Sequence, residues 1–218
     1  MWHTRPMADE PSSLVTLPSL PFRVGESPFL VKGTVFRGVL EHFDEAVAGG
    51  SKAAIERLPP HLVKFFDQPF LAASQFCYLP LFPLCAAVGQ ILVVPPARVL
   101  RGAADYVAMR DINSVYRVFL KLASPDMLVS RLPDVWNRYF NFGRMEYRLL
   151  GPRRFEVRAY GFPTVYAQLF GSVIIGWLDA GFRLTGAKSS RIFSLPLEAD
   201  GELHGVPTSC VRIEASWG

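Results

Sequence analysis

Apolar and polar residues alternate with a period of two along the last third of the chain. Met145, Tyr147 and Leu149 alternate with arginines and a glutamate, which is typical of a β-strand with one buried face. A second alternating run spans residues 155–159, and the Gly-Pro pair at 151–152 between the runs indicates a turn. The two runs predict an antiparallel hairpin with one face in water.

A helix and two more strands are predicted after this hairpin. Pro163 suits the first turn of a helix, and residues 164–180 repeat apolar side chains at helical spacing. The alternating runs 190–195 and 208–217 follow, with a polar turn region at 200–202 between them. This order predicts a four-stranded antiparallel sheet of ββαββ topology.

An amphipathic helix is predicted near the start of the chain. Residues 34–47 place valine, leucine and phenylalanine on one face and charged side chains on the other. Thr34 is expected to cap this helix. Arg37 and Glu41 are four residues apart on the charged face, so we expect them to pair.

Further helices are predicted between this one and the sheet. Residues 97–123 repeat apolar side chains at helical spacing, and shorter helices are expected to begin at residues 124 and 132, each with proline in its first turn. The predicted fold class is therefore α+β, with an N-terminal helical layer at 33–141 packed on a C-terminal sheet at 143–217.

Length and hydropathy bound the organisation of the chain. Its 218 residues suffice for one domain, which we place at 28–218 after a flexible arm, rich in proline and serine, at 1–27. The mean hydropathy is +0.21, and residues 68–97 carry no charge. Prolines leave only residues 84–94 uninterrupted, whereas a membrane span needs about 20 apolar residues. We interpret this segment as a buried core helix, with membrane association as the alternative.

Charge and cysteine content narrow the classes of partner and compartment. The net charge is +4, and the arginines of the predicted hairpin are interleaved with two glutamates, which favours a solvated sheet face over nucleic-acid binding. Three cysteines without a CxxC pair provide no disulfide framework. The N-terminus lacks the pattern of a secretory signal, so we expect a cytoplasmic protein.

The common catalytic and metal-binding motifs are absent. The sequence contains no GxGxxG, phosphate loop, HExxH or GxSxG. His42 is expected on the solvent side of its helix, and His204 in the turn before the last strand. A zinc site needs three or four ligands, and Cys77 and Cys85 lie in an apolar region where free cysteines are usually buried. We therefore expect no catalytic activity.

Aromatic side chains gather in residues 65–82 and 116–140. Two interpretations stay open. The rings fill the core, or helices made irregular by proline pack imperfectly and leave an apolar cavity for a ligand. The residues expected to line such a cavity are Phe76, Tyr78, Phe82, Tyr116, Phe119, Trp136, Phe170 and Trp177.

Several short segments occur in a characteristic order. They are Val31–Arg37, Tyr78–Pro80, Ala123–Pro125, Arg131–Trp136, Tyr139–Gly143 and Gly171–Leu178. Together they resemble an uncharacterised family expanded by paralogy in myxobacteria, which is distantly similar to the four-vinyl-reductase and haem-nitric-oxide-binding (H-NOX) domains. The resemblance implies a helical layer over an antiparallel sheet, an apolar ligand site between them, and a sensory or assembly role.

The chain departs from these families where they hold cofactors. H-NOX domains place a haem-ligating histidine on the helix before the sheet, but residues 111–140 contain no histidine. The Tyr-x-Ser-x-Arg motif of the H-NOX family is absent at 139–143, and only Cys210 stands where four-vinyl-reductase domains often carry a zinc-binding cysteine cluster. We therefore expect no haem, no zinc and no other cofactor.

Three functional hypotheses follow. The first is a non-enzymatic sensory or regulatory module that binds a small apolar molecule between the helical layer and the sheet. The second is a homodimeric protein-interaction module without a ligand, which uses the helix at 35–47 or an exposed apolar patch. The third is an enzyme of an unrecognised class.

Overall fold

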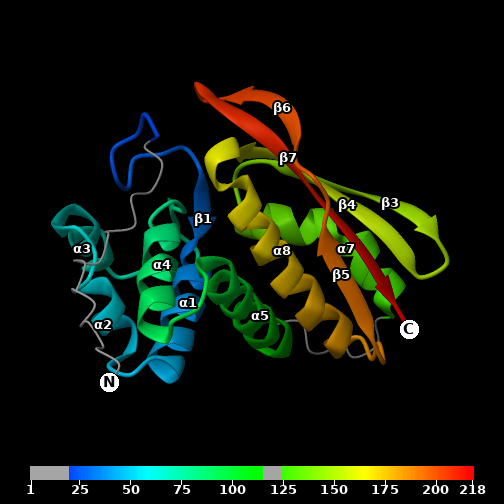
Figure 1. The fold of residues 1–218 in the computed structure, drawn as a ribbon, viewed down its shortest axis with the longest axis horizontal. Helices are drawn as coiled ribbons and strands as arrows, with labels where there is room; N and C mark the ends of the chain where they lie inside the picture. Colours follow the sequence, from blue (N-terminus) through cyan, green and yellow to red (C-terminus); the bar gives the residue numbers. More distant parts are fainter. Residues whose placement is uncertain (1–19, 115–123) are drawn as a thin grey trace, which may run out of the picture.

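A five-stranded antiparallel sheet forms one side of the computed structural model, which describes residues 20–114 and 124–218 (Figure 1). The strand order is β3–β4–β7–β5, and β6 pairs with the first half of β7 beside β5. The bounds are β3 (Arg144–Gly151), β4 (Arg154–Pro163), β5 (Ser190–Ser194), β6 (Glu198–Leu203) and β7 (Val206–Trp217). The predicted antiparallel sheet is confirmed, with one strand more than expected.

The additional strand, β6, occupies the segment predicted as a polar turn at 200–202. Its residues are exposed or only partly buried, so its sequence lacks the apolar alternation that marks the other strands. Gly201, at φ 89°, lies within the register shift of β6 against β7. The turn into β7 consists of His204 and Gly205, both at positive φ, which is the geometry of a tight two-residue hairpin.

Two helices, α7 and α8, cover one face of the sheet (Figure 1). Their bounds are α7 (Pro125–Tyr139) and α8 (Thr164–Leu184). The apolar sheet residues that alternate toward them, such as Phe155 and Ile213, are fully buried. Ser124 caps α7 by accepting a 3.3 Å hydrogen bond from the backbone N–H of Met127. Pro133 lies inside α7, so the two short helices predicted here form one continuous helix.

The remaining helices form a layer on the far side of α8 (Figure 1). α5 packs against α8, and α1 and α4 pack against α5. The bounds are α1 (Gly33–Ala46), α2 (Gly50–Ile55), α3 (Pro60–Phe66), α4 (Leu81–Leu92) and α5 (Pro96–Ser114), with a small antiparallel pair of β1 (Leu30–Lys32) and β2 (Gln75–Cys77). The predicted helical layer is confirmed. The end of the helix expected at 97–123 lies outside the described residues.

Glycines set the spacing between the helices and between helix and sheet. A β-carbon at Gly176 of α8 would overlap the backbone oxygen of Arg101 in α5. A β-carbon at Gly171 would instead lie 3.2 Å from the hydroxyl of Ser194 in β5. Because glycine has no side chain, the backbone of α8 can come close to α5 at Gly176 and to the sheet at Gly171.

Two parts of the described chain are long and apolar enough to cross a membrane, namely α8 and the pair α4–α5 taken together. In the structure, 56% of the apolar window of α8 is buried, because the helix lies between the sheet and α5. The axes of α4 and α5 meet at 109°. α4 is buried over residues 81–89, which confirms the core helix predicted at 84–94 for its first part. The helix ends at Leu92, and Val93 is 89% exposed.

Candidate functional site

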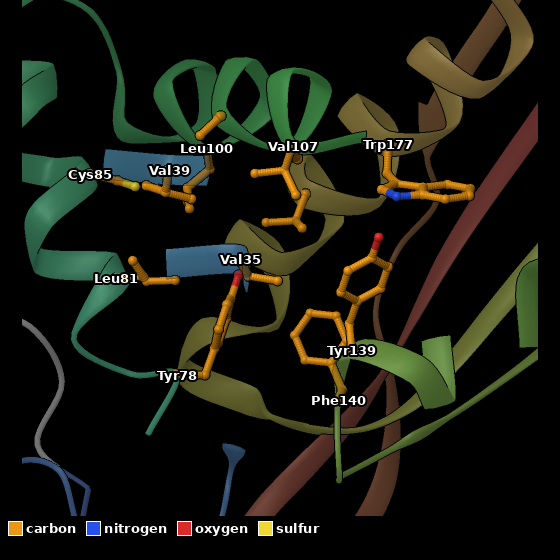
Figure 2. A pocket seen from close by; sticks show the side chains of 13 residues that line it. Val35, Val39, Tyr78, Leu81, Cys85, Leu100, Val107, Tyr139, Phe140 and Trp177 are labelled. Atoms are coloured by element: carbon orange, nitrogen blue, oxygen red, sulfur yellow. The ribbon is translucent and has the colours of Figure 1, made fainter. Parts of the chain in front are cut away.

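A cavity of about 60 Å³ lies where the helical layer meets α7 and α8 (Figure 2). We call it the helical cavity. Its described walls come from five helices and the segment before α4, so it lies between two layers of helices. The lining residues are Val35, Val39, Tyr78, Leu81, Cys85, Leu100, Ala103, Ala104, Val107, Tyr139, Phe140, Val173 and Trp177.

Helical spacing brings these apolar side chains together. α1 contributes Val35 and Val39, which are four residues apart and therefore share one side of the helix. α5 contributes Leu100, Ala103 and Val107 at spacings of three and four. The small side chain of Ala103 leaves space between its larger neighbours. The result is an almost wholly apolar lining, which suits an apolar occupant.

A second cavity, of about 50 Å³, lies between α7, α8 and β3. We call it the sheet-side cavity, since Met145 of β3 forms part of its wall. It shares four lining residues with the helical cavity. These four residues, which we call the dividing wall, are Tyr139, Phe140, Val173 and Trp177.

Tyr139 of the dividing wall is held by a charged network. Its hydroxyl donates a 2.8 Å hydrogen bond to Asp111, and Asp111 accepts bonds of 3.0 and 2.8 Å from Arg110. Arg110 also donates to Glu41 at 2.8 Å and to the backbone oxygen of Thr34 at 2.7 Å. Burial and the Asp111 carboxylate raise the pKa of Tyr139, so its phenol stays protonated. The network ties α1, α5 and α7 together beside the cavity.

The same network corrects two expectations about α1. The hydroxyl of Thr34 accepts a 2.9 Å hydrogen bond from Arg110, and α1 has no side-chain cap. Glu41 pairs with Arg110 and not with Arg37. The reason is the close approach of α5, because the Arg110 guanidinium occupies the space that a side chain at Gly38 would fill.

Two neutral polar groups, the Tyr78 hydroxyl and the Cys85 thiol, belong to the lining of the helical cavity (Figure 2). Both residues are buried, with exposed fractions of 3% and 1%. Burial raises the pKa of each group. Because burial also raises the pKa of Tyr139, the cavity wall carries two phenols and a thiol but no charge at neutral pH.

Some of the residues predicted to line a ligand site do line these cavities. Tyr78 and Trp177 face the helical cavity. Trp136, together with Trp177, lines the sheet-side cavity. Tyr116 and Phe119 lie outside the described residues.

The other predicted lining residues pack elsewhere in the core. The Phe82 ring stacks on Tyr166 with centroids 4.4 Å apart, and the Phe170 ring meets Phe162 at 4.2 Å. Phe76 belongs to a separate group of rings around α1 and α3. These rings pack on other rings and do not line the helical cavity or the sheet-side cavity. The aliphatic lining from α1 and α5 was missing from the prediction, although its spacing was present in the sequence.

Two side chains expected in solvent are shielded from it. His42 is half-buried against Tyr106, with ring centroids 4.9 Å apart, and burial lowers its pKa. Glu156, on the predicted wet face of the sheet, is only 1% exposed. Burial alone would raise the pKa of Glu156, but hydrogen bonds from Arg212 and Arg148 at 2.7 and 2.9 Å outweigh it and hold the pKa below its usual value.

The sequence matches no protein-family model and no curated protein. Its fold is similar to solved H-NOX structures. One, described as "Probing the function of heme distortion in the H-NOX family", has a TM-score of 0.63 at 10% identity over 85% of this chain and 94% of that one. An oxygen complex of an oxygen-binding H-NOX domain related to soluble guanylate cyclases has a TM-score of 0.61 at 10% identity, with the same two coverages of 85% and 94%.

An H-NOX protein from S. oneidensis in the Fe(II) ligation state gives a similar result. Its TM-score is 0.59 at 17% identity, over 86% of this chain and 96% of that one. At identities of 10–17%, these structures show an H-NOX-like fold. The fold part of the resemblance found in the sequence is thus confirmed.

The expectation that the chain holds no cofactor is contradicted by this likeness, because solved proteins of the same fold are described with heme and Fe(II). The expectation rested on a few missing motifs and did not take into account that proteins of this fold are described with heme at low sequence identity. Among the described residues no group of three or more His, Cys, Asp or Glu side chains could hold a metal ion.

The residues present can be compared with the needs of a haem. Among the residues that line the helical cavity, the groups able to ligate haem iron are Tyr78, Cys85 and Tyr139, and burial raises the pKa of all three. A cavity of about 60 Å³ is also much smaller than a porphyrin, since even a cavity of about 150 Å³ holds a molecule only as large as benzene. In this arrangement the residues do not fit a haem, and no step below runs through one.

Proposed function

We propose that this chain is a non-enzymatic sensory or regulatory module that binds a small, mainly apolar molecule in the helical cavity. The observation that carries the proposal is an apolar cavity whose wall includes Tyr139, the residue held by the Arg110–Asp111 network. The H-NOX-like fold supports it, since an oxygen-binding domain is among the similar structures. The likeness to four-vinyl-reductase domains and to a myxobacterial family belongs to the same proposal.

The geometry suggests how occupancy would reach the rest of the molecule. An occupant of the helical cavity contacts the dividing wall and favours one arrangement of the Tyr139 side chain. That side chain is bonded to Asp111 in α5, and Asp111 is bonded to Arg110, which holds α1. A ligand that prefers one arrangement shifts the population of α1 positions by its difference in affinity for the two states.

We also propose that residues 28–218 act as one domain after the arm at 1–27. This is supported by one large hydrophobic core cluster that includes Phe29 near one end of the described chain and Trp217 near the other. The proposed cytoplasmic location rests on the sequence alone.

The proposal is tested with xenon, a small apolar probe that enters dry protein cavities. Ala103→Leu adds three carbon atoms at the wall of the helical cavity and should displace the probe. We expect xenon NMR to show saturable binding to the wild-type protein, with the affinity reduced at least about tenfold in Ala103→Leu. Ala48→Leu, at an exposed position after α1, is the matched control and should bind xenon like the wild type.

Native mass spectrometry and absorbance of the purified protein complete the test. A small co-purified molecule that Ala103→Leu no longer retains would support the proposal. Equal xenon binding by Ala103→Leu and wild type would contradict it. Haem absorbance in the purified protein would instead show that the chain holds a haem, and it would contradict a small molecule as the direct occupant of the helical cavity.

A second candidate function, homodimerisation, is favoured by one observation. β3 ends the described sheet on one side, and it carries the apolar side chains of Tyr147, Leu149 and Leu150 with exposed fractions of 39%, 63% and 37%. The apolar face of α1, the other expected contact, is buried inside the protein. We expect Leu149→Lys to lower the dimer fraction in sedimentation velocity if β3 is the contact, because a lysine on an edge strand opposes pairing. A dimer fraction that Leu149→Lys leaves unchanged, or a wild-type protein that is already monomeric, would rule this contact out.

A further inference from the structure

The hydroxyl of Tyr78 has no hydrogen-bond partner among the described residues, although Tyr78 is only 3% exposed. The backbone N–H of Tyr78 donates to Phe29 at 2.9 Å, and its ring packs against Phe82 and Phe170 with centroids 5.3 and 4.9 Å away. These contacts hold the ring so that its oxygen points toward Val35 and the helical cavity (Figure 2). Among the described residues, every side-chain nitrogen or oxygen that is fully enclosed has a hydrogen-bond partner. The Tyr78 oxygen has none, so it is not fully enclosed, and the space that it borders is the helical cavity.

This missing partner is informative because buried hydroxyl groups in proteins are nearly always hydrogen-bonded. An unsatisfied buried donor costs about 1–3 kcal/mol, so such a group usually meets a ligand or an ordered water. Around Tyr78 the cavity lining is almost wholly apolar. A water in this space would find few of the two to four polar partners that it needs.

The chemistry of the lining defines what can bind there. Burial raises the pKa of both Tyr78 and Cys85, so both groups keep their protons at neutral pH. They offer an O–H donor and a weak S–H donor, and no charge for an ion. The volume of about 60 Å³ equals roughly four water-sized spheres, which limits an occupant to a few heavy atoms.

We propose that the helical cavity takes a small neutral molecule with an apolar body and one hydrogen-bond acceptor, such as a carbonyl oxygen, and that the Tyr78 hydroxyl donates to this acceptor. The inference rests on the proposed ligand-binding function and adds the chemical class of the ligand. Tyr78 then determines specificity, because it satisfies its own buried donor only when the occupant carries an acceptor.

Acetone and isobutene test this inference, since they have nearly the same shape and only acetone has an acceptor. Both are titrated into the wild-type protein and Tyr78→Phe, and binding is followed by protein NMR. We expect Tyr78→Phe to weaken acetone binding roughly tenfold, the effect of one lost hydrogen bond, and to leave isobutene binding within about twofold. Tyr147→Phe, which removes a hydroxyl from a partly exposed tyrosine of β3, is the matched control and should change neither.

The outcomes separate this inference from the proposal beneath it. Equal changes for acetone and isobutene in Tyr78→Phe would overturn the acceptor specificity and leave the cavity as an apolar site. Binding of neither probe to the wild type would overturn the proposed function itself. Isobutene binding also reports whether Tyr78→Phe is folded. In wild-type protein alone, a Tyr78 ring-carbon shift that acetone causes and isobutene does not would support the inference, and equal shifts would overturn it.

Discussion

The carboxylate of Glu156 is buried on the outer face of the sheet, where only 1% of the residue is exposed. Glu156 alternates with buried residues, so its sequence position correctly places it on the outer face of the sheet. The burial of that position depends on Arg148 of β3 and Arg212 of β7, which pair with it across the sheet. Strand register sets these partners, and a single sequence does not reveal the register.

The burial of Glu156 leads to a prediction about pH. Because the pKa of this carboxyl is lower in the folded protein, its charged form stabilises the fold above its unfolded pKa of about 4.3. That stabilisation is lost as the pH falls through the folded pKa. We expect Glu156→Gln to lower the free energy of unfolding by about 2 kcal/mol at pH 7, since hydrogen bonds from Arg212 and Arg148 to a charged group are weakened or lost. Urea denaturation at a series of pH values should show this difference shrink in acid.

A surface glutamate provides the control for this experiment. Glu146 pairs with Arg144, and the two side chains are 54% and 62% exposed. Glu146→Gln should therefore change the free energy of unfolding by less than about 1 kcal/mol. Similar effects of the two substitutions at pH 7 would show that the burial of Glu156 has no energetic consequence.

At the scale of helices and strands, periodicity was enough to locate most elements. The amphipathic helix α1 and the hairpin of β3 and β4 were found because each buries one regular face. β6 was missed, since both of its faces are mostly in solvent. Pro133 was taken as a helix start, but the helix continues through it. Proline is favoured in the first turn of a helix, but this preference does not show whether the residues before Pro133 are already helical.

The two glycines of α8 allow a prediction about helix packing. A side chain at Gly176 meets the backbone of Arg101, which has no rotamer to change, whereas one at Gly171 meets the Ser194 side chain, which can rotate. We expect Gly176→Ala to destabilise the protein by roughly 1–3 kcal/mol. In Gly171→Ala the gain in helix propensity, about 1 kcal/mol, should offset most of the steric cost of the contact with Ser194. Thermal unfolding of both variants measures the difference, and equal effects would argue against the close contact of α8 with α5.

At the scale of the whole molecule, the sequence left open whether the aromatic residues fill the core or line a cavity. The cavity forms where five helices meet, so its lining depends on how α5 and α8 cross, and glycine contacts decide that crossing. The prediction followed the aromatic residues because they are conspicuous in the sequence. Most of the lining is aliphatic, and α1 and α5 provide the larger part of these aliphatic residues. Only the packing of the helices distinguishes an aliphatic residue that lines a cavity from one that fills a core.

The Arg110–Asp111–Tyr139 network should carry the effect of a ligand from the cavity to α1. If so, xenon will slow amide hydrogen exchange in α1 of the wild-type protein, by about fivefold if the coupling is near the low end of the usual range. Tyr139→Phe keeps the ring in the dividing wall and removes the hydrogen bond to Asp111. We expect exchange in α8 to respond to xenon in this variant as before, because Val173 and Trp177 still contact the probe, while the response of α1 is lost. An unchanged α1 response in Tyr139→Phe would mean that the coupling runs through the direct contact of Val35 and Val39 with the ligand and not through the charged network.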